Sequence, residues 1–420
     1  MRILWFTNTP SLYDQGKHSY HGGGWIESLE ELLQKDKSIE LAVSFFHRAD
    51  QHKLIKEETT YYPILRESGR KNLLNFIVNK RSGKLESEHI IIPKLLDVID
   101  DFRPDVIHVF GTEEIFSSVQ TYTKIPVVIH LQGLLNPYVN AYFPSGHNSL
   151  SFLFSPFFSL MNIIGLGNLS GYKRFKNQAT REAVCLRRAK YVMGRTEWDK
   201  RVAKIYNPDI SYFHVDEVLR SHFYNNKNER KTQRSKIIIV STLSPTIYKG
   251  IDVILKTANL LKNETKIDFE WSIIGLNDDD KLLKYFISST KIEPEKVNLK
   301  FIGKKTPDEL KEILLQTSIF IHPSYIDNSP NSVCEAQIMG VPVIACNVGG
   351  ISSLIDHKET GILVPSNGVF EIVSWVVQLS RDQELLNLLS QNGKFKAQLR
   401  HNQIKIIEEL ISVYKTIKDS

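Results

Sequence analysis

One stretch decides the fold of this chain: residues 322–345, which read HPSYIDNSPNSVCEAQIMGVPVIA. The short apolar run before it, 318–321, is typical of a buried β-strand. A polar loop rich in Asn, Ser and Pro follows, and it leads into a helix expected over 332–339. Gly340 ends that helix as a C-cap, and 341–345 is again an apolar strand. The stretch therefore predicts a strand–loop–helix–strand unit of a parallel α/β sheet.

Two acids stand eight positions apart in this stretch, Asp327 in the loop and Glu335 in the helix. The N-terminus of a helix offers backbone N–H groups and the positive end of its dipole to an anion. An acid about one turn inside such a helix can also accept hydrogen bonds from a vicinal diol such as a ribose. The spacing alone leaves two interpretations open, a nucleotide-sugar pocket or acids that merely cap and solvate a helix start.

The stretch resembles the signature of the retaining glycosyltransferases of family four, which have the GT-B fold and carry two Glu residues at this spacing. Residues 340–345, together with VGGI at 348–351, are similar to that family's continuation. One position departs from the pattern, because Asp327 is one methylene shorter than the family's Glu. The resemblance covers nearly the whole chain and is most specific over 318–351.

Length and composition agree with a two-domain globular protein. A chain of 420 residues exceeds the usual size of a single core. With 42% hydrophobic and 24% charged residues it is an ordinary globular protein, and its net charge of +6 is mild. Three cysteines are too few for a disulfide framework, and no metal-ligand spacing is present. No zinc spacing or basic stripe indicates a nucleic-acid partner.

The opening residues, 1–8, turn polar too early for a signal peptide, and no apolar run reaches membrane-spanning length. We therefore expect a cytoplasmic protein. A peripheral contact at the inner face of the cytoplasmic membrane stays open as part of this expectation. Residues 149–166 are dense in aromatics and are followed by several Lys and Arg residues, a combination that an interfacial membrane segment or a lipid-tailed acceptor would need. The alternative is a buried hairpin with a solvated basic face.

Strands alternate with helices in the first half of the chain, which predicts a parallel sheet. Strands are expected over 39–45, 105–111 and 126–133, and a helix over 90–102. Ligands bind at the carboxyl ends of such strands, where His108 and His130 fall. A lone His there is more often a core residue than a catalytic one. The family resemblance implies that His130 contacts the donor sugar, whereas His108 is the weaker candidate and is interpreted as structural.

The glycines at 22–24 precede a helix that is expected to begin beside Trp25. Glycines at this place let a bound group approach the backbone closely. From the residues alone, a flexible loop tip is an equally good interpretation. The resemblance implies that Gly23 and Gly24 face the donor phosphates and the acceptor.

The second half begins with a polar, charged linker over 225–236 and a strand over 236–241. Lys249 lies just before a helix expected over 251–261, where its ammonium suits a diphosphate. The resemblance implies an Arg and a Lys on the leaving diphosphate in this loop. The Lys is kept as Lys249, but Thr242 stands where the family has the Arg. Either another cation substitutes, or the diphosphate is stabilised less.

We therefore predict an α/β protein with two Rossmann-like, doubly wound domains facing a cleft. The expected parts are an acceptor-side domain (1–224), a linker (225–236), a nucleotide-sugar-binding domain (237–393) and a helix (394–420) that packs back on the first domain. The resemblance implies a retaining glycosyltransferase that needs no cofactor, since the nucleotide-sugar is its donor substrate. A metal is not expected, because no acid–x–acid pair stands at a strand end near the expected diphosphate. Its expected acceptor is a hydroxyl of a glycan, lipid-linked in the setting of surface-polysaccharide assembly.

In this reading Lys249 takes up the leaving charge, Asp327 holds sugar hydroxyls, and His130 contacts the same sugar. Glu335 holds the ribose. The remaining donor-binding candidates are Asn331 and Ser332 at the helix start, Thr242, Gly23 and Gly24.

Two rival functions follow from the residues. Thr242 and Asp327 together favour a nucleotide-sugar-binding protein of the same fold with weakened catalysis. A nicotinamide oxidoreductase is less favoured, because neither strand–helix loop carries the dinucleotide glycine pattern.

Overall fold

The computed structural model describes residues 1–14, 24–49, 51–66, 73–158, 160, 168–224 and 236–420. The chain divides into two compact units. The first unit comprises Met1–Val139, Met161–Val218 and His401–Ser420, and the second comprises Asn140–Leu160 and Leu219–Arg400. Gly23 and all but the last residue of the predicted linker lie outside the described residues.

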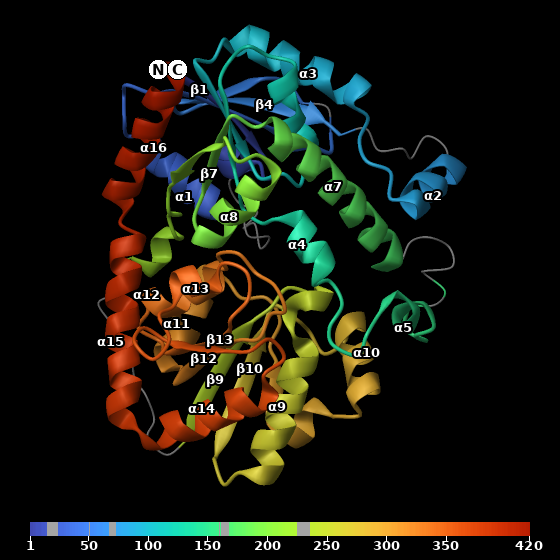
Figure 1. Cartoon of the computed structure of the whole chain (residues 1–420), viewed down its shortest axis with the longest axis vertical. Coiled ribbons are helices and arrows are strands. Elements are labelled where there is room, and N and C mark those ends of the chain that lie inside the picture. Colours follow the sequence, from blue (N-terminus) through green and yellow to red (C-terminus); the bar gives the residue numbers. More distant parts are fainter. Residues whose placement is uncertain (15–23, 50, 67–72, 159, 161–167, 225–235) are drawn as a thin grey trace. The chain divides into compact units, whose positions relative to one another are not determined.

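The first unit is built on an eight-stranded sheet with the order β3-β4-β2-β1-β5-β6-β7-β8 (Figure 1). All neighbours are parallel except β3 and β4. The strands are β1 (Arg2–Thr7), β2 (Glu40–His47), β3 (Leu54–Lys56), β4 (Thr59–Leu65), β5 (Val106–Phe110), β6 (Val127–His130), β7 (Tyr191–Gly194) and β8 (Ser211–His214).

Seven helices and two 3-10 turns are described in the first unit. They are η1 (Ser11–Asp14), α1 (Gly24–Leu33), α2 (Leu73–Ser82), α3 (Glu88–Phe102), η3 (Ile115–Thr121), α4 (Leu135–Asn140), α7 (Asn168–Arg188), α8 (Glu197–Tyr206) and α16 (Gln403–Lys418). None of the described helices of the chain is both long and apolar enough to cross a membrane.

Side chains of β1 alternate between the two faces of this sheet, as the period of two requires. Leu4 and Phe6 join the core beneath α3 and η3. Trp5 points to the opposite face, where its indole Nε1–H donates to the hydroxyl of Tyr414 in α16 at 3.0 Å. The C-terminal helix α16 is thus an integral part of the first unit.

The second unit has a six-stranded parallel sheet with the order β11-β10-β9-β12-β13-β14 (Figure 1). Its strands are β9 (Ile237–Thr242), β10 (Phe269–Ile274), β11 (Leu299–Phe301), β12 (Ile319–His322), β13 (Val343–Cys346) and β14 (Ile362–Val364). Its helices and 3-10 turns are α5 (Ser149–Leu153), η4 (Ser221–Phe223), η5 (Ile247–Lys249), α9 (Ile251–Glu264), α10 (Lys281–Thr290), η6 (Pro294–Val297), α11 (Pro307–Gln316), α12 (Asn331–Ile338), α13 (Ile351–Leu354), α14 (Val369–Arg381) and α15 (Gln383–Arg400).

Both faces of this second sheet are covered by helices, which explains why apolar side chains predominate in its strands. Ile319 and Ile321 of β12 enter the core formed with α9, α10 and α14. Phe320, between them, enters the core formed with α11, α12 and α13. Two doubly wound sheets of Rossmann type are therefore present, and this part of the fold prediction is confirmed.

Residues 140–160 differ from the predicted domain boundaries, because they belong to the second unit although they lie in the first half of the chain. Phe152 packs on Tyr285 of α10 with ring centroids 4.2 Å apart, and both Phe152 and Phe158 are buried in the core of the second unit. Burying one Phe side chain stabilises by about 1.5–3 kcal/mol, so two such anchors are enough to hold the segment there. Within the described residues this segment forms the short helix α5 and turns. Residues 159 and 161–166 of the predicted aromatic segment lie outside the described residues.

The predicted continuous helical tail from residue 394 is interrupted. Helix α15 ends at Arg400, and α16 begins after Asn402, whose side-chain oxygen accepts a hydrogen bond from the backbone N–H of Lys405 at 3.1 Å. The break coincides with the point at which the chain returns to the first unit, at His401. An N-cap residue thus separates two helices where the sequence pattern suggested one.

Candidate functional site

The central strands of the second sheet, β9 and β12, end side by side at Thr242 and His322. The hydroxyl of Ser241, one residue before the end of β9, donates to the carbonyl of Ile321 at 2.6 Å. This bond joins the two strand ends that carry the predicted donor loops. Ligands of open α/β sheets bind at such carboxyl ends.

Lys249 reaches the β12 side of this edge because Gly250 follows it. Gly250 has a φ of +78°, and a Cβ atom there would lie only 2.2 Å from the carbonyl oxygen of Pro323. A side chain at this position would push the two loops apart. With glycine, the loops touch, and the Nζ atom of Lys249 lies 2.5 Å from Oδ2 of Asp327. The structure thus brings two of the predicted catalytic residues together as an ion pair.

Asp327 is held from several sides. Its Oδ2 also lies 2.9 Å from Nε2 of His322, and the backbone N–H of Asn328 donates to its Oδ1 at 3.2 Å. Its carbonyl oxygen accepts from the N–H of Gly350 at 3.0 Å, and a Cβ at Gly349 would lie 1.9 Å from that same oxygen. The glycine pair after β13 is therefore explained by its close packing on the backbone of the acid.

The charges of this group follow from its surroundings. Burial by itself raises the pKa of Asp327, but the charge of Lys249 and the hydrogen bond from His322 outweigh burial and lower it. Burial lowers the pKa of His322, although Asp327 acts in the opposite direction. At neutral pH the group therefore consists of an ionised carboxylate, an ammonium and a neutral imidazole.

Glu335 lies in α12 and is only 3% exposed. Its partner is Arg220, whose Nε and Nη2 lie 2.8 and 2.7 Å from Oε1. Burial raises the pKa of Glu335, and Arg220 opposes that shift. Both contacts end on Oε1, and no side chain in the described part of the chain is bonded to Oε2.

Three more of the donor-binding candidates, Asn331, Ser332 and Thr242, lie at the same edge of the second sheet. Asn331 and Ser332 open α12, whose N-cap, Pro330, supplies no side-chain hydrogen bond to the first turn. Thr242 ends β9, and its Oγ1 is buried without a hydrogen-bond partner among the described residues. Ser324, just after β12, has the same property. Buried polar groups of this kind call for a partner, such as a bound ligand or water.

His130 ends β6 in the first unit and is one end of a buried chain of polar groups. Its Nδ1 lies 3.2 Å from Nε2 of His108, and His108 Nδ1 lies 2.7 Å from the hydroxyl of Tyr414. Burial lowers the pKa of both imidazoles. His108 is thus tied into the core on both ring nitrogens. Nε2 of His130 is buried and has no partner within the described residues.

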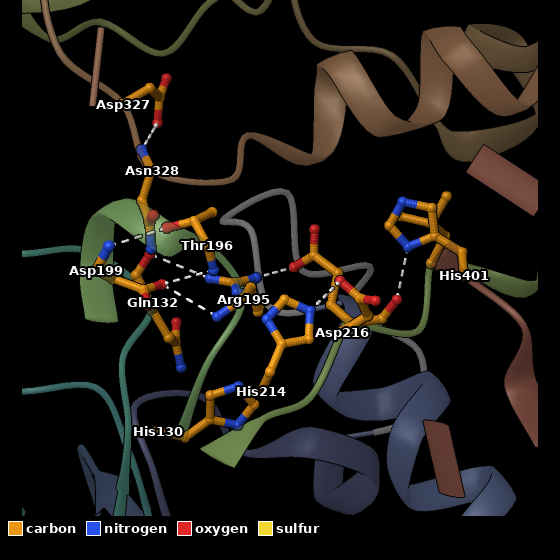
Figure 2. Close-up of polar contacts among 12 residues, drawn as sticks. His130, Gln132, Arg195, Thr196, Asp199, His214, Asp216, Asp327, Asn328 and His401 are labelled. Carbon is orange, nitrogen blue, oxygen red and sulfur yellow. Dashed lines mark hydrogen bonds and ion pairs between the residues drawn. The ribbon is translucent and has the colours of Figure 1, made fainter. Parts of the chain in front are cut away.

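Figure 2 shows the polar contacts next to His130 in the first unit. Arg195 forms a buried ion pair with Glu217, and its Nη2 donates to the carbonyl of Gln132 at 3.1 Å. Thr196 caps α8 and accepts from the N–H of Asp199 at 3.1 Å. Arg195 is therefore used to hold the ends of β6, β7 and the following loop together.

Sequence reasoning missed two residues of the second unit, Arg220 and His322. Arg220 lies 115 positions from Glu335, and nothing in its local pattern indicates a counter-ion. His322 stood in the quoted stretch, five positions before Asp327. A His at a strand end next to a predicted site acid was the available signal. Of the glycine pair near Trp25, Gly24 opens α1, and Gly23 is outside the described residues.

An acid of the first unit with a buried side-chain oxygen was also not predicted from the sequence. Glu113 follows β5, and its Oε2 is buried without a partner in the described part of the chain. Burial raises the pKa of Glu113 from 4.5 to about 7. In the folded protein the carboxyl group of Glu113 keeps its proton up to about pH 7, whereas in the unfolded chain it loses the proton above about pH 4.5. Glu113 therefore lowers the stability of the fold progressively as pH rises from about 4.5 to about 7, and not further above that.

Glu113→Gln should remove this pH dependence. We expect the variant and the wild type to be equally stable near pH 4.5 and the variant to gain up to about 3 kcal/mol at pH 8, since each pH unit between the two pKa values counts for about 1.4 kcal/mol. Urea unfolding at both pH values measures the difference. Glu31→Gln, at an exposed position of α1, is the control and should change neither value. Equal pH dependence in Glu113→Gln and the wild type would contradict the assignment.

Residues 221–396 match the family model described as Glycosyl transferases group 1. The amylovoran biosynthesis glycosyltransferase AmsK of Erwinia amylovora is 26% identical over 185 residues, which are 43% of this chain and 44% of that protein. The chain thus aligns with less than half the length of the curated relatives it matches first.

Solved structures match over the whole chain. Sucrose-phosphate synthase from Thermosynechococcus elongatus has 14% identity and a TM-score of 0.73, with 99% of both chains covered. HepE from Anabaena, in complex with UDP-glucose, has 13% identity and a TM-score of 0.64, with 99% of this chain and 100% of that chain covered. These likenesses show that the fold is GT-B, as predicted.

Proposed function

We propose that this chain is a retaining glycosyltransferase that moves a sugar from a nucleotide-sugar to a hydroxyl acceptor. The observation that carries the proposal is the convergence of Lys249, Asp327 and His322 at the carboxyl edge of β9 and β12. This edge lies within the residues that match the glycosyltransferase family model. HepE, a structure of the same fold, is described in complex with UDP-glucose, which supports a donor of this class here.

The difficult step is breakage of the bond between the sugar C1 and the diphosphate oxygen. Lys249 and the N–H groups at the start of α12 would neutralise the departing diphosphate, so catalysis is mainly electrostatic. The oxygen of the acceptor hydroxyl bonds to C1 on the face that the diphosphate leaves. Its proton passes to the departing phosphate oxygen. The step needs no protein nucleophile, no metal and no further cofactor.

The geometry of the second unit supports further donor contacts as part of this proposal. Oε2 of Glu335 would accept from the ribose hydroxyls while Arg220 holds Oε1. Asp327 would accept from hydroxyls of the transferred sugar once Lys249 turns to the diphosphate. Thr242 supplies a hydroxyl but no charge where the family has an Arg, and contact of His130 with the sugar stays a prediction.

A panel of nucleotide-sugars tested by thermal shift identifies the donor, because a ligand that binds the folded state alone raises its stability by mass action. The stabilising donor is then incubated with glycan acceptors, and product formation is measured. Thr242 and Asp327, the two departures from the family pattern, favour the second candidate, a nucleotide-sugar-binding protein without catalysis. A donor that binds tightly but gives neither transfer nor hydrolysis would establish that alternative.

We propose further that the acceptor is a lipid-linked glycan in polysaccharide biosynthesis, reached at the inner face of the cytoplasmic membrane. AmsK takes part in amylovoran biosynthesis, which supports the polysaccharide setting. Residues 140–160 contain no Lys, Arg, Asp or Glu. Leu150, Phe154 and Leu160 are 58%, 76% and 70% exposed on this segment. An uncharged segment with such side chains suits the interface of a bilayer.

Phe154→Ser should weaken binding to vesicles that contain anionic phospholipid at least several-fold, because an exposed Phe contributes about 1.5–3 kcal/mol when it enters an apolar phase. Vesicle flotation measures the bound fraction. Phe370→Ser in α14 is the matched control, since Phe370 is 73% exposed but lies far away in sequence. An equal loss in both variants, or no binding by the wild type, would refute the membrane contact.

A further inference from the structure

His322 is a buried imidazole that the proposed mechanism does not yet use. It ends β12 and is only 1% exposed. Its Nε2 lies 2.9 Å from Oδ2 of Asp327, and Lys249 Nζ lies 2.5 Å from the same oxygen. One carboxylate oxygen therefore serves two partners of different kinds.

The protonation of His322 follows from this contact. An ionised carboxylate can only accept a hydrogen bond, so Nε2 must carry the proton. Burial lowers the pKa of His322, which keeps the ring neutral at physiological pH although Asp327 opposes that shift. Nδ1 then carries the lone pair, and this atom has no partner among the described residues.

Donor binding disturbs this arrangement. Under the proposed function, Lys249 turns from Asp327 to the diphosphate of the donor. A buried carboxylate that loses its cation is costly, by several kcal/mol, unless other donors remain on it. Two such donors are the His322 Nε2–H on Oδ2 and the N–H of Asn328 on Oδ1. Of these two donors, only the side chain of His322 can be removed by a substitution, because the other is a backbone N–H.

We propose that His322 is a positioning residue that keeps Asp327 ionised and in place while Lys249 transfers from that carboxylate to the donor diphosphate. The inference rests on the proposed function and deepens it. In the free protein, Asp327 forms an ion pair with the ammonium of Lys249. The carboxylate of Asp327 becomes available to sugar hydroxyls only when that ammonium binds the diphosphate instead. His322 acts through Asp327 and contacts no reacting atom.

A double-mutant cycle on the full chain tests this exchange of partners. Binding of uridine and guanosine diphosphate is measured by calorimetry for the wild type, His322→Leu, Lys249→Met and the double variant. His322→Leu should weaken binding about tenfold in the wild-type background, because release of Lys249 then leaves Asp327 without either of the two groups that contact its Oδ2. In the Lys249→Met background no ammonium has to be released, so the same substitution should change affinity less than about twofold.

His322→Gln should restore most of the affinity that His322→Leu loses, because the amide N–H of Gln can donate to Asp327 in place of the imidazole Nε2–H. A purely structural role would weaken binding equally in both backgrounds and would leave Gln no better than Leu. Either result overturns the proposal.

The imidazole itself gives a readout that needs no nucleotide. In the full chain with ¹⁵N-labelled histidine, the signals of His322 are those that vanish in His322→Gln. We expect a neutral ring with the proton on Nε2. Asp327 and Lys249 are the charged groups that act on it, and the charge of Lys249 lowers its pKa, so Lys249→Met should raise that pKa.

A proton on Nδ1, or a ring charged at neutral pH, would overturn the pairing with Asp327. Failure of every diphosphate to bind the wild type would instead contradict the proposed function, whatever the ring shows. The two failures are thus distinguishable.

Discussion

Lys249→Met is expected to lower turnover with the cognate donor about 100- to 1,000-fold. The substitution keeps the length of the side chain and removes the charge that would neutralise the departing diphosphate. Loss of one such preorganised electrostatic group costs about 2.7–4 kcal/mol in the transition state, which corresponds to that range. Donor affinity should fall less than turnover, because in the proposed mode of binding other residues contact the nucleoside part of the donor. Initial rates and calorimetry with the same donor separate the two effects.

The control for this variant concerns the fold. Lys249→Met leaves Asp327 buried without its cation, and breaking a buried ion pair from one side destabilises by about 3–5 kcal/mol. Lys249→Met combined with Asp327→Asn removes both charges and should recover much of that stability without recovering turnover. Lys249→Arg keeps the charge and should retain part of the activity. A wild-type rate in Lys249→Met would remove this residue from the mechanism.

Glu335→Ala is expected to weaken donor binding about 10- to 100-fold, with the nucleoside diphosphate affected as much as the whole nucleotide-sugar. The expected loss equals one or two hydrogen bonds to a charged group, at about 1.5–3 kcal/mol. The loss should be equal for both ligands because the proposed contact is with the ribose, which both contain. Calorimetry on the full chain measures both affinities, and an unchanged affinity would refute the ribose contact.

Arg220→Gln supplies the matched test of the same contact. It leaves the carboxylate of Glu335 in place but removes the counter-ion that opposes the effect of burial on its pKa. The pKa of Glu335 should rise further, so donor affinity should improve as pH increases and the carboxyl ionises. Affinity that is independent of pH in Arg220→Gln would show that the ionised form of Glu335 is not required.

The strand–loop–helix unit at 318–345 could be read from the sequence because its signals are local. The predicted strand appears as β12, the predicted helix as α12, and Gly340 after that helix has the positive φ of +74° that a C-cap glycine needs. Each of these features depends on residues within one turn or one strand of each other. Such short-range preferences survive in any tertiary context that keeps the element.

The structural unit to which residues 140–160 belong could not be predicted from local sequence signals. The aromatic pattern indicated apolar contacts but not their partner. Phe152 finds that partner in Tyr285, more than a hundred positions further along the chain. Apolar burial is non-directional, so the same pattern is compatible with packing on either unit.

The sequence by itself determined the fold class, the two-sheet organisation and the positions of Lys249, Asp327 and Glu335 at strand ends and a helix start. Only the tertiary structure decided their partners. It paired Lys249 with Asp327 across 78 positions and Glu335 with Arg220 across 115, and it buried His322 against the shared carboxylate. The physical reason is that the order of strands in a sheet, which no local pattern encodes, sets which loops meet at its edge. Charges buried at that edge then have to find partners there.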